Sequence, residues 1–138
     1  MTAPPFQLPP GGVVIGLGCD VIEVERVKGV VERQGERFLA RVFTPEERAY
    51  CLAKANPYPH LAARFAAKEA ISKCFTTGIG GNFGWKTASV ARGERQEPWV
   101  VLDEAGRNLL AQIGGTRVLV SLSHTQTVAM AVAAIVRQ

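Results

Sequence analysis

The sequence has few of the residues that indicate a metal centre built from soft ligands or a disulfide framework. Its 138 residues include three cysteines, Cys19, Cys51 and Cys74, and two histidines, His60 and His124. The cysteines are odd in number and widely spaced, and none lies in a C-x-x-C arrangement, so no zinc pattern is indicated. This spacing favours reduced thiols in a cytoplasmic protein.

Long apolar runs are also lacking. No run approaches the length needed to cross a bilayer, so we expect no membrane partner. The first twelve residues, MTAPPFQLPPGG, contain four prolines but no basic residue. They lack the apolar core of a signal peptide. We predict that residues 1–12 form a flexible N-terminal tail.

Charge is not concentrated anywhere along the chain. The net charge of +4 is mildly basic, which suits an anionic partner such as a phosphorylated small molecule, a nucleic acid or an acidic protein. The surplus is scattered and no aromatic platform accompanies it, which opposes a small nucleic-acid binder. A hydrophobic content of 47% predicts a globular chain, and this length suits one domain with a two-layer core.

The periodicity predicts a strand, several helices, a hairpin, one helix and a final hairpin. Strands are expected over 13–19, 85–92, 99–103, 118–123 and 128–136; helices are expected over about 21–34, from residue 45 for two or three turns, over about 60–75 and over 103–115. Thr44, Pro45 and Glu47 form a capping-box pattern. The segment NPYP at 56–59 is expected to break the helix that begins at residue 45. The predicted fold class is α+β, a single small domain with a mostly antiparallel sheet packed against helices.

Two glycine-rich segments resemble nucleotide motifs but fail on spacing. In GLGCDV, Val21 stands where G-x-G-x-x-G needs its third glycine, and in GIGGNFGWKT, Trp85 separates Gly84 from Lys86. Trp85 and Trp99 are interpreted as core or hairpin aromatics.

The expected helix over 60–75 carries Glu69 and Lys73 at the edge of a broad arc of small residues. A solvated i,i+4 ion pair is one interpretation. The other is a functional pair that needs a partner, and Asp20 at the end of the first strand is the candidate. Asp20 could instead cap the following helix. If Asp20 and Glu69 meet, their hard oxygen ligands would favour Mg²⁺ bound together with substrate phosphates.

Four segments resemble the holo-acyl-carrier-protein synthases, the short group of 4′-phosphopantetheinyl transferases. They are GLGCDVIEVERV (16–27), FTPEE (43–47), RFAAKEAISK (64–73) with TGIG (77–80), and SLSH (121–124). The resemblance implies that residues 13–138 form a domain with the 4′-phosphopantetheinyl transferase fold. It also implies a homotrimer with sites at subunit interfaces.

The resemblance implies roles for five residues. Asp20 and Glu69 would bind Mg²⁺ with the diphosphate of coenzyme A, and Lys73 would lie near the phosphates. His124 would lie near the coenzyme A nucleotide, although a satisfied histidine at a strand end is an equal alternative. Arg26 would help to dock an acidic apo acyl carrier protein. Arg26, Arg33 and Arg37 would form one stripe if residues 24–37 were continuously helical, or a salt-bridged surface without function.

The implied activity is Mg²⁺-dependent transfer of 4′-phosphopantetheine from coenzyme A to a serine of the carrier protein, in fatty acid biosynthesis. In that mechanism Glu69 and Lys73 are catalytic, and the N–H groups of Thr77, Gly78 and Gly80 hold phosphate oxygens. Glu69 or a metal-bound water could be the base. A coenzyme A binding module without transfer activity is the rival, and release of adenosine 3′,5′-bisphosphate separates the two.

Overall fold

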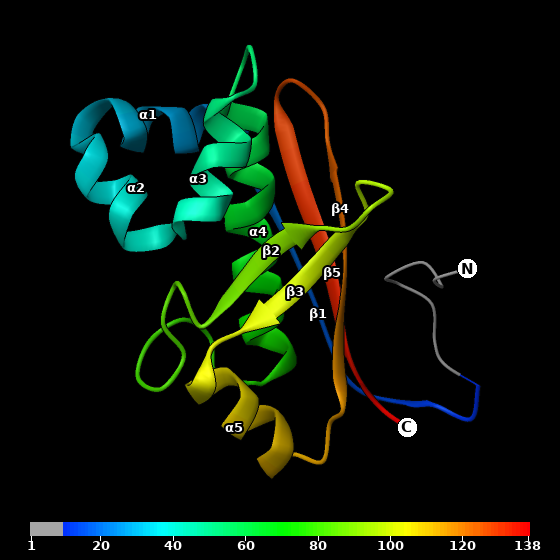
Figure 1. Ribbon diagram of the computed structural model, residues 1–138. Coiled ribbons are helices and arrows are strands. Elements are labelled where there is room, and N and C mark those ends of the chain that lie inside the picture. Colours follow the sequence, from blue (N-terminus) through cyan, green and yellow to red (C-terminus); the bar gives the residue numbers. More distant parts are fainter. Residues whose placement is uncertain (1–9) are drawn as a thin grey trace.

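A long helix lying across a three-stranded sheet forms the centre of the molecule (Figure 1). The computed structural model describes residues 10–138. In chain order the elements are β1 (Val13–Glu23), α1 (Val24–Gln34), α2 (Glu36–Val42), α3 (Pro45–Leu52), α4 (Tyr58–Cys74), β2 (Ala88–Arg92), β3 (Pro98–Leu102), α5 (Glu104–Gln112), β4 (Arg117–His124) and β5 (Val128–Arg137). Helices α1, α2 and α3 gather at one end of α4, and α5 lies at the other end.

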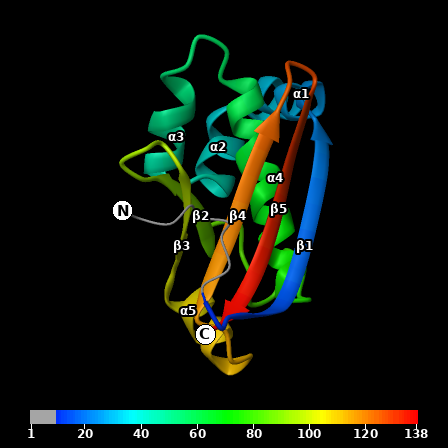
Figure 2. The same ribbon diagram turned by 90° about the vertical axis from the view of Figure 1, so that its right-hand side faces the viewer.

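The larger sheet has the order β1-β5-β4, so the last strand of the chain is central. Both of its pairings are antiparallel, and β2 and β3 form a separate antiparallel hairpin. Figure 2 looks onto the three-stranded sheet with α4 behind it. The α+β prediction with a mostly antiparallel sheet is therefore confirmed.

Helix α4 packs unusually close to β1 because glycines of the strand face it. A Cβ at Gly16 would lie 2.6 Å from the carbonyl oxygen of Cys74, and one at Gly18 would clash with the carbonyl oxygen of Ala70. Alanines of α4 such as Ala66 and Ala70 are fully buried at this interface. Strand residues alternate between faces, so Asp20 shares the α4-facing side with the two glycines.

Helix signals in the sequence are confirmed at two starts. Thr44 caps α3: its Oγ1 accepts from the Glu47 N–H at 3.2 Å, and Glu47 Oε1 accepts from the Thr44 N–H at 3.0 Å. Asp103 caps α5 by accepting from the Gly106 N–H at 2.8 Å. Both final strands and the β2–β3 hairpin also lie where the alternation places them.

Four details differ from the predictions. The first strand does not end at Asp20 but continues to Glu23, because residues 21–23 pair with residues 128–130 of β5. Asp20 therefore does not cap a helix. Helix α4 begins at Tyr58, inside the segment 56–59 and earlier than the expected residue 60, since Pro59 is tolerated in the first turn of a helix. Helix α2 was not predicted; it has seven residues and one short buried face.

The cysteines, the helices and the N-terminal segment were each the subject of a prediction. All three cysteines are free, and burial raises the pKa of Cys51 to about 11 and that of Cys74 to about 12. Among the helices of residues 10–138, none is both long and apolar enough to cross a membrane. The predicted flexible tail concerns residues 1–12, of which 1–9 lie outside the described residues.

Candidate functional site

The two predicted acids, Asp20 and Glu69, line one cavity of about 460 Å³. Asp20 comes from the α4-facing side of β1, and Glu69 comes from the half-buried edge of α4. The glycine contact between the two elements brings their backbones together and so places both carboxyl groups at the same opening. The structure thus joins residues that are 49 positions apart in the sequence.

Lys73 joins the acids, but not through the i,i+4 pair that the helix spacing suggested. Its Nζ lies 3.1 Å from Asp20 Oδ1 and donates to the Cys19 carbonyl oxygen at 2.9 Å. The hydrogen bond to Asp20 raises the pKa of Lys73. Among the described residues, Lys73 therefore pairs across to the strand, and Glu69 takes part in no ion pair within 4 Å.

Glu69 is left in an environment that disfavours its charge. Burial raises its pKa, the nearby charge of Asp20 raises it further, and Lys73 opposes both effects. A carboxylate that is partly desolvated beside a second carboxylate gains most from an added cation.

The donor set fits a magnesium ion shared with a phosphorylated substrate. Within residues 10–138, no three His, Cys, Asp or Glu side chains cluster into a complete metal site. Mg²⁺ is commonly held by only one or two carboxylates, with phosphates and waters completing its coordination. Asp20 and Glu69 supply that number of hard oxygen ligands in one cavity.

Part of the lining of this cavity is aromatic. Trp85 is half-buried and stacks on Phe65, with ring centroids 4.7 Å apart, and Phe65 lies 6.4 Å from Phe38. All three line the cavity with the acids. Trp85 precedes β2 and so lies outside the hairpin strands, but it packs partly buried against the hydrophobic core, which is the other predicted alternative, and it also lines the cavity. Its position next to Lys86 and after a glycine-rich loop was the available signal.

Arg26 lies at the rim of the same cavity and is exposed. Arg33 is also exposed on α1, but Gly35, with φ of 55°, ends that helix. Arg37 belongs to α2. The stripe that a continuous helix over residues 24–37 would form is therefore interrupted.

His124 lines a different cavity, of about 330 Å³, between α4, β4 and the hairpin. Its most unusual member is Arg64, which is 1% exposed. Within residues 10–138, none of the three guanidinium nitrogens of Arg64 has a hydrogen-bond partner. The guanidinium stacks on the ring of Tyr50 at 4.1 Å, and Arg92 lies on the same ring at 5.0 Å. A buried cation without an acceptor indicates that an anion belongs here.

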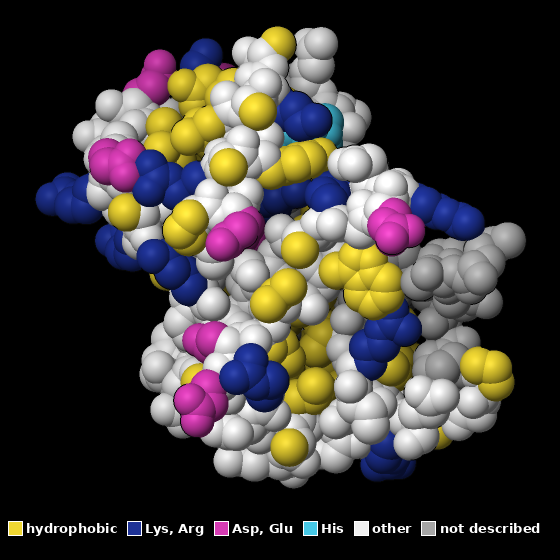
Figure 3. Space-filling view, in the orientation of Figure 1, with side chains coloured by type: hydrophobic (Ala, Val, Ile, Leu, Met, Phe, Trp, Pro, Cys, Tyr) yellow, Lys and Arg dark blue, Asp and Glu magenta, His cyan; other side chains and the backbone are white. Residues whose placement is uncertain are grey.

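Two histidines complete this basic cavity. The rings of His60 and His124 are 4.9 Å apart in an edge-to-face arrangement. Burial lowers the pKa of His60, and so do His124 and the nearby cations. Figure 3 shows a histidine surface directly against Lys and Arg side chains. Sequence reasoning missed Arg64; its signal was a cation in line with the buried residues Ala67 and Ile71 of α4.

The loop after α4 does not offer the free N–H groups that were predicted. Thr77 and Gly78 donate to the Ser72 carbonyl oxygen at 3.3 and 3.4 Å, and Gly80 donates to Phe83 at 2.8 Å. These three groups satisfy the turn itself in this structure, and their role as phosphate contacts stays a prediction.

Comparisons with known proteins show the family to which the chain belongs. Residues 16–133 match the model of the 4′-phosphopantetheinyl transferase superfamily. The chain is 48% identical over 120 residues to the holo-[acyl-carrier-protein] synthase of Chlamydia trachomatis, a match covering 87% of this chain and 98% of that one. It is 40% identical over 119 residues to the synthase of Koribacter versatilis, covering 86% and 95%.

Solved structures show the same fold. The holo-[acyl-carrier-protein] synthase of Neisseria meningitidis has a TM-score of 0.83 at 28% identity, covering 89% of this chain and 98% of that one. The Helicobacter pylori synthase in complex with coenzyme A has a TM-score of 0.77 at 26% identity, covering 86% and 98%. The chain belongs to the 4′-phosphopantetheinyl transferase superfamily and, within it, to the holo-[acyl-carrier-protein] synthases, which are enzymes.

Proposed function

We propose that this chain transfers 4′-phosphopantetheine from coenzyme A to a serine of apo acyl carrier protein, releasing adenosine 3′,5′-bisphosphate. The observation that carries the proposal is the shared cavity of Asp20, Glu69 and Lys73. The family supports it, as does the coenzyme A bound by the Helicobacter pylori relative. We assign residues 13–138 as the transferase domain, the location as cytoplasmic and the pathway as fatty acid biosynthesis.

In this mechanism the diphosphate lies over the acid pair. Magnesium bound by Asp20 and Glu69 would neutralise the negative charge of the diphosphate oxygens. Lys73 holds a fixed positive charge at the same opening, where Asp20 and the Cys19 carbonyl oxygen orient its Nζ. The serine oxygen forms a bond to the phosphorus next to the pantetheine arm, and its proton passes to Glu69 or to water. The bond from that phosphorus to the bridging oxygen breaks, and adenosine 3′,5′-bisphosphate leaves with that oxygen. Such a transfer depends mainly on positioning and charge stabilisation.

The basic cavity suits the nucleotide end of coenzyme A. Arg64 is a buried guanidinium without an acceptor, Arg92 lies beside it, and His124 lines the same space. A 3′-phosphate supplies the acceptors that this guanidinium lacks, since Arg matches phosphate geometry with several donors. This assignment supports the role of His124 as a contact of the nucleotide.

We propose a homotrimer in which these two cavities meet across subunit interfaces. Figure 2 looks onto the side of the sheet that faces away from α4. Along β1, Leu17 is 67% and Val21 is 66% exposed. Val128 and Met130 of the neighbouring strand are also exposed. A contiguous apolar patch on an isolated chain indicates a protein interface.

Docking of the acidic carrier protein is assigned to Arg26 and the exposed arginines of α1 and α2. Arg26 lies at the rim of the acid-pair cavity, so a carrier bound there would bring its serine to the diphosphate. The surface over α1 and α2 carries several Lys and Arg side chains (Figure 3). Complementary charge mainly sets the encounter rate and specificity.

The test is the intact mass of an apo carrier protein after incubation with this protein, Mg²⁺ and coenzyme A. We expect a gain of one phosphopantetheine and release of one adenosine 3′,5′-bisphosphate. Omission of Mg²⁺ should abolish the gain. An unchanged mass, together with measurable coenzyme A binding, would instead support a binding module without transfer activity.

A further inference from the structure

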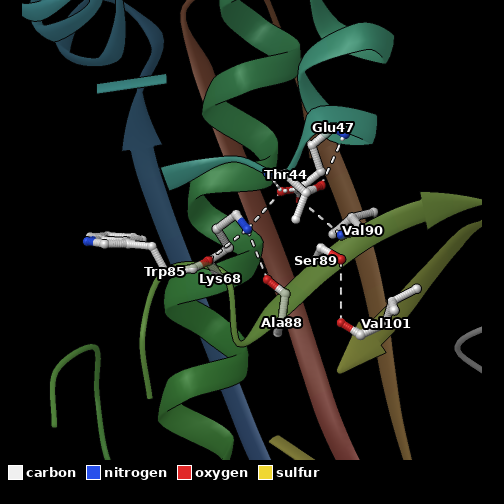
Figure 4. Close-up of polar contacts among 8 residues, drawn as sticks. All are labelled: Thr44, Glu47, Lys68, Trp85, Ala88, Ser89, Val90 and Val101. Carbon is white, nitrogen blue, oxygen red and sulfur yellow. Dashed lines mark hydrogen bonds and ion pairs between the residues drawn. The ribbon is translucent and has the colours of Figure 1, made fainter. Parts of the chain in front are cut away.

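Glu47 of α3 and Lys68 of α4 form a buried ion pair next to the segment that carries Trp85 (Figure 4). Neither side chain has exposed surface, and Lys68 Nζ lies 2.8 Å from Glu47 Oε1. The same Nζ donates to the carbonyl oxygens of Trp85 and Ala88 at 2.8 and 2.9 Å. An ammonium group has three N–H donors, so each one has an acceptor.

Glu47 is equally satisfied. Its Oε1 also accepts from the Thr44 N–H at 3.0 Å, and its Oε2 accepts from the Val90 N–H at 2.9 Å. One carboxylate therefore closes the capping box of α3 and holds the middle of β2. Sequence reasoning gave Glu47 the capping role alone.

Stability does not explain why this network is ionic. Replacing a buried ion pair by well-packed apolar residues is often neutral or stabilising. What charged hydrogen bonds add is a defined position for the groups that they join. Here they fix a segment without helix or strand: residues 84–87 form turns, and the Trp85 carbonyl oxygen is held by Lys68.

That segment carries one wall of the cavity. In Figure 4 the carbonyl group of Trp85 points to Lys68, and its indole points away from the network. The indole stacks on Phe65 and lines the cavity that contains Glu69. Lys68 and Glu69 are consecutive on α4, so the helix presents one side chain to the buried network and the next to the site.

We propose that Glu47 and Lys68 are positioning residues, which hold the Trp85 indole in place as the wall against which the uncharged arm of coenzyme A packs. Naming coenzyme A rests on the proposed function. The diphosphate lies at the acid end of the cavity, and the neighbouring pantoyl group of coenzyme A carries two methyl groups. An aromatic wall beside the acids suits those methyl groups.

The experiment replaces the pair by apolar residues, in the double variant Glu47→Leu with Lys68→Met. A Trp99→Phe background leaves Trp85 as the single tryptophan, because the chain has two. We expect the double variant to fold and acrylamide quenching of its Trp85 emission to increase. We also expect KM for coenzyme A to rise about tenfold at nearly constant kcat, because misplacement of a binding group by ~1 Å can cost on the order of 10²-fold. Wild-type quenching and KM in the folded double variant would overturn the proposal.

Two further variants make the result specific. Ile135→Ala removes a buried side chain of β5 and destabilises the fold without changing the pair. Quenching of Trp85 in this variant should stay at the wild-type level. An increase equal to that of the double variant would overturn the proposal. In a Trp85→Ala background, replacing the pair should raise KM no further, whereas additive effects would contradict the assignment. Should the double variant not fold, Glu47→Gln alone takes its place in both measurements.

Failure of this proposal and failure of the proposed function give different results. The emission of Trp85 reports its immobilisation without any turnover. If Trp85 becomes more mobile in the double variant but the wild-type protein never modifies a carrier, the positioning role of the pair stands and the assignment of coenzyme A as the ligand fails.

Discussion

Lys68 and Lys73 lie on the same helix, and each pairs with a carboxylate from another element, but solvent reaches them very differently. The Lys68–Glu47 pair has no exposed surface and every donor is used. In the other pair the Lys73 side chain is 50% exposed and that of Asp20 is 20% exposed. Beside the open pair stands Glu69, a carboxylate whose pKa is raised by burial and by Asp20. A closed pair can only hold structure, whereas an open pair with a surplus acid can bind a ligand.

The largest expected effect comes from breaking the closed pair. Lys68→Met leaves Glu47 as an uncompensated buried charge, and we expect a loss of about 3–5 kcal/mol in the free energy of unfolding. Lys73→Met, the matched change in the open pair, should cost about 1 kcal/mol or less. Urea denaturation of both variants measures the difference. Similar losses in the two variants would remove the distinction between the pairs.

The next effect concerns activity. Glu69→Gln keeps the shape of the side chain but removes its charge, so we expect kcat to fall on the order of 10²–10³-fold, as for loss of one preorganised electrostatic contact. The free energy of unfolding should stay nearly constant. Glu32→Gln, on the exposed surface of α1, is the control. Turnover by the Glu69→Gln variant at the wild-type rate would refute the metal-binding role.

Lys73→Ala should have a smaller kinetic effect, because Lys73 shares its charge with Asp20. We expect kcat to fall by roughly tenfold to a hundredfold, below the loss expected for a metal ligand. KM for the carrier protein should be unaffected. A change that appears only in that KM would count against a role at the phosphates.

Arg26→Glu tests the exposed rim rather than the centre of the site. We expect KM for the acidic carrier to rise by about tenfold at low salt, with a difference that shrinks as salt screens the charges. Arg95→Glu, in the turn of the β2–β3 hairpin, is a control of equal charge change. Equal effects of the two reversals would argue for net charge instead of a docking position.

The smallest effect is a titration. In the metal-free protein, the pKa of Glu69 should lie above its ordinary value of 4.5. A carboxyl group whose pKa is raised by folding binds protons more tightly in the folded state, so this group adds stability as pH falls from the folded pKa toward 4.5. Carbon-detected NMR of Glu69 measures it, and Asp20→Asn should lower the value. A Glu69 pKa at or below 4.5 would contradict the proximity of the acids.

The open site was predictable and the closed pair was not, for physical reasons. Local signals placed the strands, the α3 cap and α4, and the resemblance placed Asp20 beside Glu69. Helical periodicity assumes that cations avoid the buried face, so it could not assign Arg64 and Lys68, whose partners lie in distant segments. Helix α2 is too short for its periodicity to stand out. The tertiary pairing of residues 21–23 with β5 likewise delays the helix that was expected from residue 21, so that it begins at Val24.

The contact between β1 and α4 sets how tolerant the reaction centre can be. Gly16 and Gly18 have a hydrogen atom where other residues have a Cβ, and main-chain oxygens of α4 lie too close to leave room for that Cβ. The gap between the carboxyl groups is therefore dictated by backbone atoms, the least adjustable part of a protein. One added methyl at residue 18 would wedge β1 away from α4 and separate the acids, so this enzyme is vulnerable at a residue whose side chain is a single hydrogen atom.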